Sequence, residues 1–159
     1  MNLRIMVEEK VELKTGYTTG SSATAAAKAA LLSIINQKKI QNVGIILPRR
    51  SFLQIPVESC EFENEKAKCT VIKNGGDDPD VTHGAEIIVE LSFTDKVNEI
   101  EIDGGEGVGI VTKQGLGLEI GKPAINPVPK KMINENLRES GKEILEKKGI
   151  RIVISVPKG

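Results

Sequence analysis

The sequence predicts an α+β fold with a mixed or antiparallel sheet and two main helices. Its 159 residues suit a single domain that buries a core of its own. Several short apolar segments have strand-like composition, whereas only two long segments have helical periodicity. Because the two kinds of segment do not alternate strictly, we expect an α+β arrangement and not a doubly wound parallel sheet.

Residues 20–37 are expected to form a helix that is buried on most of its sides. Small and apolar residues recur at helical spacing along one face, namely Ala23, Ala27, Ala30, Leu31, Ile34 and Ile35. Ala25, Ala29 and Leu32 make the opposite side nearly as apolar. Such small side chains allow close approach by neighbouring elements.

The middle of the chain is expected to supply most of the sheet. Residues 43–48 have the composition of a strand, and residues 54–62 and 67–74 that of a β-hairpin. Residues 87–93 and 98–103 are predicted to form a further antiparallel pair.

The last third of the chain is expected to hold a short strand, a helix and a final strand. Residues 108–113 form the short strand between two glycine clusters, and residues 150–157 the final, central strand. Between them, residues 129–149 are predicted to form one amphipathic helix, because Pro129 and Gly149 suit its two ends. The apolar stripe of this helix is Ile133, Leu137, Ile144 and Leu145.

The composition argues against several classes of protein. The 22 basic and 22 acidic residues cancel, and only 3% of residues are aromatic, so neither nucleic acid nor an anionic membrane is an expected partner. No apolar run approaches the roughly 20 residues of a membrane span. With two cysteines there is no disulfide framework, and we expect a cytoplasmic protein.

The start of the first helix is a candidate anion site. Helix N-termini carry unsatisfied N–H groups and a partial positive charge. Glycine here allows close approach, and neighbouring hydroxyls add donors, so the predicted ligand-binding residues are Thr18, Thr19, Gly20 and Ser21. The alternative, about equally supported by composition, is a helix capped by Thr19 or Ser21 with no ligand.

A glycine-rich segment follows residues 98–103 and is a second candidate. Its D-x-G-x-G-x-G pattern resembles a nucleotide loop, but strand-like residues follow it where a Rossmann unit has a helix. We therefore expect a loop that lies against a ligand, formed by Asp103, Gly105, Gly107 and Gly109, with Lys113 and Asn126 as nearby polar candidates. In this interpretation Gly107→Val abolishes turnover and leaves folding largely intact.

No metal site is predicted. Asp77, Asp78 and Asp80 lack the spacing of a calcium loop and are expected to form a solvated turn. His83 is the only histidine, and one histidine with two distant cysteines does not make a zinc site. Cys60 and Cys69 can face each other across the predicted hairpin as buried thiols. The basic pairs Arg49–Arg50 and Lys130–Lys131 are expected to be solvated or to hold carboxylates.

Three segments together resemble the CbiD family of cobalamin (vitamin B12) biosynthesis: "TGYTTGSSATAAAKAAL", "DDPDVTHGAEI" and "DGGEGVGIVTKQGLGLEIGKPAINPVPKKMI". The resemblance implies methyl transfer from S-adenosylmethionine to ring carbon 1 of cobalt-precorrin-5B. The substrate is then a cobalt-corrinoid that carries many carboxylates. No catalytic residue and no protein-bound metal are implied. The family usually has cysteine at the position of Ser22.

The resemblance also implies an architecture. The N-terminal part of the family resembles a permuted second domain of ribosomal protein S5. Family members are roughly twice as long, so residues 1–159 are expected to form their N-terminal domain without the α/β domain that follows it. The alternative is a non-catalytic binding or scaffold domain that needs a partner domain. Self-association, or docking with that further domain, stays open.

Overall fold

The computed structural model describes residues 19–73, 84–108 and 127–157. The elements follow in this order: α2 (Thr19–Asn36), β1 (Asn42–Ile46), β2 (Phe52–Pro56), β3 (Ser59–Glu63), β4 (Lys66–Ile72), β5 (Glu86–Thr94), β6 (Ile100–Gly104), α3 (Pro127–Ser140), α4 (Lys142–Leu145) and β7 (Gly149–Ser155).

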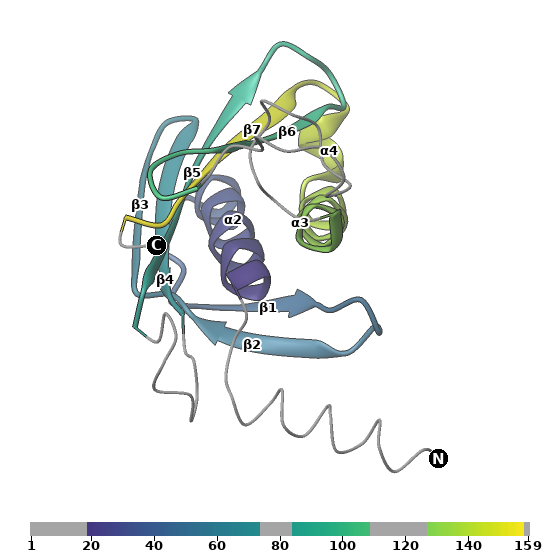
Figure 1. Ribbon diagram of the computed structural model, residues 1–159. Helices are drawn as coiled ribbons and strands as arrows, with labels where there is room; N and C mark the ends of the chain where they lie inside the picture. The colour runs from purple at the N-terminus through teal and green to yellow at the C-terminus, as the bar shows by residue number, and fades with distance from the viewer. Residues whose placement is uncertain (1–18, 74–83, 109–126, 158–159) are drawn as a thin grey trace.

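The strands form two sheets. One has five strands in the order β3-β4-β5-β7-β6, in which only β6 and β7 are parallel, and β1 and β2 form a separate antiparallel pair. Helix α2 lies across one face of the larger sheet, and α3 lies beside α2 (Figure 1). The predicted α+β class with a mixed sheet is therefore confirmed, while the likeness to a permuted ribosomal domain stays a prediction.

Side chains alternate between the two faces of the five-stranded sheet, as strand geometry requires. One cross-strand row faces the helices and is buried, with Cys60, Cys69, Val89 and Ile154 in register. The next row faces away and runs Glu61, Lys68, Glu90 and Val153. The sheet thus has one covered face and one charged face, and each fully buried Ile or Leu stabilises the covered side by about 1.5–3 kcal/mol.

Helices α2 and α3 pack side by side and run in the same direction. Near their starts, a methyl group at Gly20 would lie 3.1 Å from the Pro129 ring. Near their ends, one at Gly141 would lie 3.0 Å from the Leu31 side chain. The contact therefore advances 11 residues along α2 and 12 residues from Pro129 to Gly141, which directly follows α3, so the two N-termini lie at the same end of the pair.

Several expectations are confirmed. Helix 20–37 is α2, and 12 of its 18 residues are buried, in keeping with a helix enclosed on most sides. The predicted strand 43–48 overlaps β1, and the final strand β7 lies inside the sheet between β5 and β6. The cysteines of β3 and β4 face each other in the predicted hairpin. Apart from residue 108, the predicted strand 108–113 lies outside the described residues.

The predicted pairing of residues 87–93 with 98–103 is wrong. Strand β7 lies between β5 and β6, and it pairs antiparallel with β5 and parallel with β6. The chain from β6 through α3 to β7 is a strand–helix–strand crossover, which places its two strands side by side and parallel. The two strands are neighbours along the chain, but the apolar β7 takes the buried place between them.

Two of the predicted elements are each split into two shorter elements in the structure. The helix expected over 129–149 is broken at Gly141 into α3 and α4, because glycine is a poor helix former and its backbone here leaves the helical region. The strand expected over 54–62 is split after Pro56, which cannot donate a ladder hydrogen bond. Its first half, in β2, pairs with β1 and not with β4.

A buried asparagine attaches the β1–β2 pair to α3. The Asn136 side chain is 1% exposed, and its Oδ1 accepts from Ile46 N at 2.9 Å. Its Nδ2 donates to Ile46 O at 3.0 Å and to Met132 O at 2.8 Å. The amide therefore bonds to the edge of β1 much as a neighbouring strand would.

Candidate functional site

The predicted anion-binding residues lie in the first turn of α2. Thr19 is exposed and Gly20 half-buried, whereas Ser21 is only 5% exposed and lies inside the helix. Ser21 is therefore not the helix cap, and that part of the alternative interpretation is wrong. Thr18 lies outside the described residues.

Two helix N-termini meet at this place. Gly20 of α2 lies against Pro129 of α3, and neither helix has an acidic residue in its first turn. Each N-terminus carries about half a positive charge. The first turn of α2 has N–H groups without a helical partner, whereas in α3 Pro127 and Pro129 have no N–H, so that Val128 and Lys130 supply its free amides. In addition, α3 places Lys130 and Lys131 beside this end. We call residues 19–22 and 129–131 the helix-end site; its charge favours an anion.

The first turn of α2 also holds a buried hydroxyl group, that of Ser22. It is 0% exposed, and its Oγ has no hydrogen-bond partner in the described part of the chain. Such a hydroxyl costs about 1–3 kcal/mol when it is buried without a partner. Ser22 lies two residues, or about 200°, from Gly20 around α2, so its side chain leaves the helix on the side away from α3.

Asp103, in the second predicted group, is engaged by its own neighbours. Its Oδ1 accepts from Gly104 N at 2.8 Å, and its Oδ2 accepts from Arg151 Nη2 at 3.0 Å. These contacts keep the carboxylate on the charged face of the sheet, with a half-exposed side chain. The local contacts account for this aspartate without a ligand.

The glycines that follow β6 have a packing role. The Gly105 amide donates to Ile154 O at 2.7 Å, and a side chain at this position would meet Ser155 Oγ. Gly107 has a φ of +79°, and a Cβ there would overlap the backbone carbonyl of Val156. Close approach to the end of β7 therefore requires both glycines. The expectation that Gly107→Val leaves folding intact is contradicted by this geometry.

The two predicted groups contact different elements. Residues at the start of α2 lie against α3, whereas residues 105–107 lie against the end of β7. Figure 1 shows α2 beginning near β1, while the loop after β6 runs beside the C-terminal end of β7. Gly109, Lys113 and Asn126 lie outside the described residues, as do His83 and the three predicted turn aspartates.

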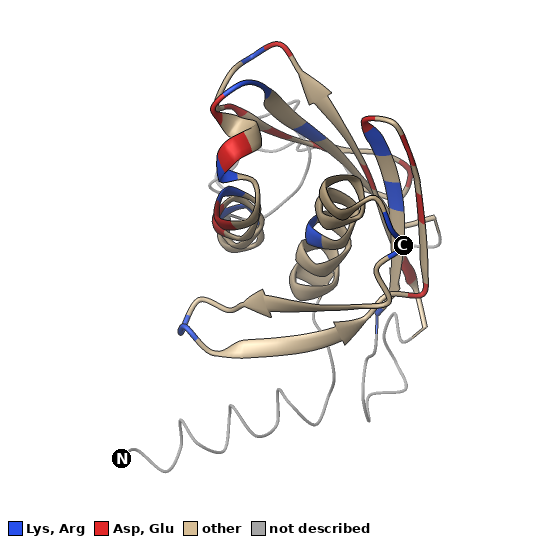
Figure 2. Cartoon of the chain, turned by 180° about the vertical axis from the view of Figure 1, so that it is seen from behind, with Lys and Arg blue, Asp and Glu red and all other residues tan. Residues whose placement is uncertain are grey.

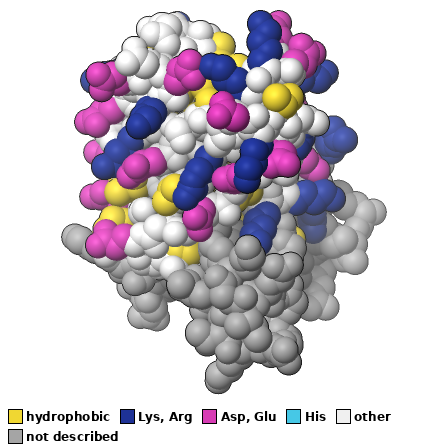
Figure 3. Space-filling model, turned by 90° about the horizontal axis from the view of Figure 1, so that it is seen from above, with side chains coloured by type: hydrophobic (Ala, Val, Ile, Leu, Met, Phe, Trp, Pro, Cys, Tyr) yellow, Lys and Arg dark blue, Asp and Glu magenta, His cyan; other side chains and the backbone are white. Residues whose placement is uncertain are grey.

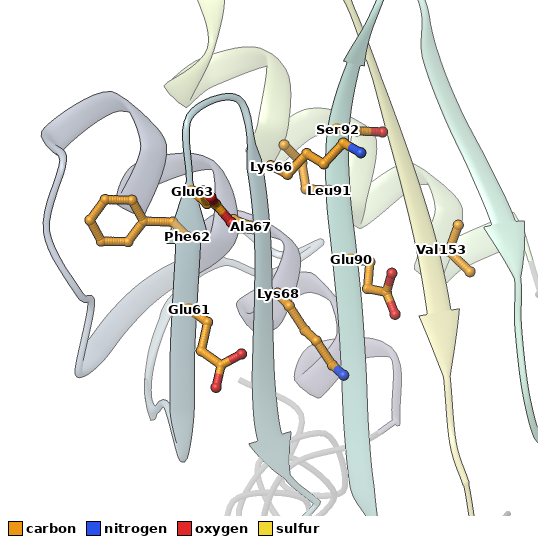
Figure 4. Close-up of a pocket in the computed structure, with 10 residues that line it drawn as sticks. All are labelled: Glu61, Phe62, Glu63, Lys66, Ala67, Lys68, Glu90, Leu91, Ser92 and Val153. Carbon is orange, nitrogen blue, oxygen red and sulfur yellow. The ribbon is translucent and has the colours of Figure 1, made fainter.

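The charged face of the sheet holds a shallow depression that does not suit an anionic ligand. Glu61, Lys68 and Glu90 project from three consecutive strands, so charges of opposite sign are neighbours (Figure 4). Basic and acidic side chains are also interspersed on the side of the molecule seen from above in Figure 3. Cross-strand pairs of opposite charge stabilise a solvated sheet face, and we assign that role to this surface.

Buried titratable groups elsewhere act structurally. Lys28, the only charged residue of α2 (Figure 2), donates from Nζ to Gly44 O at 2.6 Å. Burial lowers the pKa of Lys28, and the charge of Glu139 partly offsets this effect. Burial, with a contribution from the Cys60 thiol, raises the pKa of Cys69 well above its ordinary value. A protonated, enclosed Cys69 is a poor nucleophile and a poor metal ligand.

The described residues contain no group of three or more histidine, cysteine, aspartate or glutamate side chains arranged to hold a metal ion. None of the described helices is long and apolar enough to cross a membrane.

Comparison with known proteins gives one consistent result. The sequence model of the CbiD family matches residues 6–159. A cobalt-precorrin-5B C(1)-methyltransferase of Geobacillus sp. is 46% identical over 153 residues, which are 96% of this chain and 42% of that protein. Its counterpart in Priestia megaterium is 47% identical over 152 residues, 96% of this chain and 41% of that protein. The chain therefore spans about two fifths of the length of these relatives.

A solved structure agrees with the sequence matches. The crystal structure of the cobalamin biosynthesis protein cbiD from Archaeoglobus fulgidus superposes with a TM-score of 0.62 at 31% identity. The match covers 87% of this chain and 43% of that one.

Proposed function

The chain belongs to the CbiD family, and from that membership we propose that it forms part of a cobalt-precorrin-5B C(1)-methyltransferase. The proposed reaction transfers a methyl group from S-adenosylmethionine to carbon 1 of the cobalt-bearing macrocycle, in the anaerobic route to cobalamin. The observation that carries the proposal is the 46–47% identity, over 96% of the chain, to relatives of that name.

The helix-end site fits the chemistry of the substrate. A precorrin carries acetate and propionate arms, and carboxylates bind to helix N-terminal amides, hydroxyls and lysines. The N-terminal ends of the two parallel helices meet where Gly20 lies against Pro129, and the exposed Thr19 lies at the start of α2. The free amides of α2 and the two lysines of α3 are the donors nearest to this place. We propose that residues 18–22 bind a carboxylate of the macrocycle or of the methyl donor.

The proposed reaction needs little acid–base catalysis from the protein. S-adenosylmethionine supplies the methyl group, the acceptor is a ring carbon, and the leaving group is a neutral thioether. Such a transfer depends mainly on holding donor and acceptor in line. We therefore propose that the helix-end site binds and orients a ligand. The second predicted group is proposed to support this binding and orientation. That second group is Asp103, Gly105, Gly107, Gly109, Lys113 and Asn126.

We further propose that the chain is one domain, corresponding to the N-terminal part of its relatives, and that it works in the cytoplasm. A second candidate function is a non-catalytic binding domain that acts only with a partner domain. The chain covers about two fifths of each relative, and if the methyltransferase site lies between this part and the remainder, neither part is active alone.

Titration of the chain with S-adenosylhomocysteine and with a cobalt-corrinoid carboxylate tests the proposal. We expect saturable binding of at least one of them, measured by calorimetry beside the full-length Priestia megaterium relative. If the relative binds and this chain binds neither ligand, the proposal that this part carries a binding site is wrong. Binding without turnover, together with turnover when the remaining part of the relative is added, would favour the second candidate.

A charge introduced at the helix-end site separates ligand binding from stability. Thr19→Asp places a carboxylate at the exposed start of α2, where it stabilises the helix by about 0.3–1 kcal/mol. The same carboxylate repels an anionic ligand, so we expect a higher melting temperature and weaker binding. Ser59→Asp adds the same charge on an exposed position of β3 and is the matched control. Equal affinities in the two variants would contradict the site.

A further inference from the structure

A groove lies between α3 and the edge strand β6. Its apolar floor is formed by Ile100 and Ile102, and its polar wall by Lys130, Lys131 and Asn134. The groove has a volume of about 310 Å³, at the small end of ligand pockets. A space of this size suits one or two carboxylate arms with their methylene stems, and it is too small for a whole macrocycle.

The two lysines are placed where they weaken their own helix. Positive charge near a helix N-terminus is unfavourable, and the first turn of α3 has no acidic residue to offset it. Neither lysine forms a hydrogen bond or ion pair within the described ranges. An anion held between them would be favoured by both charges and by the helix end.

Asn134 is held in an orientation that presents a donor. Arg138 Nε donates to Asn134 Oδ1 at 2.6 Å, and this bond identifies the oxygen of the amide. Arg138 is itself fixed, because its Nη1 and Nη2 donate to Asn98 Oδ1 at 2.9 Å and Asn98 O at 3.0 Å. The Asn134 Nδ2 group then remains to donate into the groove beside the lysines.

We propose that this groove binds the carboxylate arms of the corrinoid substrate, an inference that rests on the function proposed above. Lys130, Lys131 and the Asn134 amide donate to the carboxylate oxygens. The methylene stems of the arms lie on Ile100 and Ile102, so the groove matches both the charged and the apolar part of each arm. The groove then lies next to the paired helix ends and extends the same anion-binding surface toward β6.

The test compares two charge-matched double variants of the chain. Lys130→Met with Lys131→Met removes the two groove cations and keeps side chains of similar length. Lys38→Met with Lys39→Met removes two consecutive exposed lysines just past the end of α2. The probes are cobyrinic acid, a cobalt corrin with free carboxylates, and its fully esterified derivative, each titrated at two salt concentrations. Far-UV circular dichroism confirms that both variants are folded.

We expect the groove variant to bind cobyrinic acid about tenfold more weakly than the unchanged chain, a loss of about 1.4 kcal/mol. The Lys38–Lys39 variant keeps its affinity, and the esterified probe binds the groove variant and the unchanged chain equally. If both double variants bind cobyrinic acid equally well, the groove is not a subsite, although the proposed function survives. If the unchanged chain does not bind cobyrinic acid, both the groove and a corrinoid site on this chain are wrong.

Discussion

Two glycines with nearly the same backbone conformation test how closely the loop after β6 packs on β7. Gly107 and Gly84 have φ values of +79° and +86°. A Cβ at Gly107 would overlap the Val156 carbonyl, whereas one at Gly84 would have no atom of the described residues within 4 Å, its own chain neighbours aside. Alanine at either position carries backbone strain of about 1–2 kcal/mol, but only at position 107 must the loop or the end of β7 also move.

The expected effects therefore differ. We expect Gly84→Ala to cost about 1 kcal/mol of unfolding free energy. Gly107→Ala should cost about 3–5 kcal/mol, since it combines strain with a backbone collision, the range of the more damaging point mutations. Urea unfolding followed by circular dichroism measures both values. Equal costs would refute the close packing of residues 105–107 on β7 and restore the interpretation in which glycine serves a ligand.

Three further predictions follow from buried polar groups. Asn136→Leu leaves the Ile46 N–H and C=O without their partner and should destabilise the chain by about 2–4 kcal/mol in urea unfolding; a loss under 1 kcal/mol would contradict the anchoring role. Ser22→Ala removes an unpartnered hydroxyl, so stability should stay equal or rise by up to about 1 kcal/mol; a marked loss of stability would show that the hydroxyl is bonded in the free protein. Cys69 has a raised pKa when folded, so above its ordinary value of 9.0 only the unfolded chain releases that proton. Stability should then fall with rising pH, by up to about 1.4 kcal/mol per unit, and Cys69→Ala should remove this part of the slope. The lowered pKa of Lys28 acts in the opposite sense but equally in both proteins, and an unchanged slope in the variant would contradict the burial of the thiol.

What the sequence revealed of the fold depended on local patterns. The alanine periodicity of α2 and the cysteine pairing of β3 and β4 are short-range features, and both were predicted. The parallel pairing of β6 and β7 joins segments that are 45 or more residues apart along the chain, so no local pattern contains it. The break at Gly141 was missed because the apolar stripe continues in register on both sides of it.

The candidate site was predicted in part, for the same reason. Hydroxyls and glycines at a helix start were visible in the sequence, and so was the pair Lys130–Lys131. That the two helices run parallel and bring these features together depends on packing between Gly20 and Pro129, which sequence spacing does not encode. Asn136 also looked like an ordinary polar residue of an amphipathic helix, because its partner in β1 lies 90 residues away.

The central claim is that the paired N-termini of α2 and α3 bind an anionic ligand. The most direct measurement is a ¹H–¹⁵N correlation titration of the chain with cobyrinic acid. We predict that the largest chemical-shift changes occur at the amides of residues 19–22 and 130–131. Changes confined to the charged sheet face, at residues such as Glu61, Lys68 and Glu90, would contradict the claim.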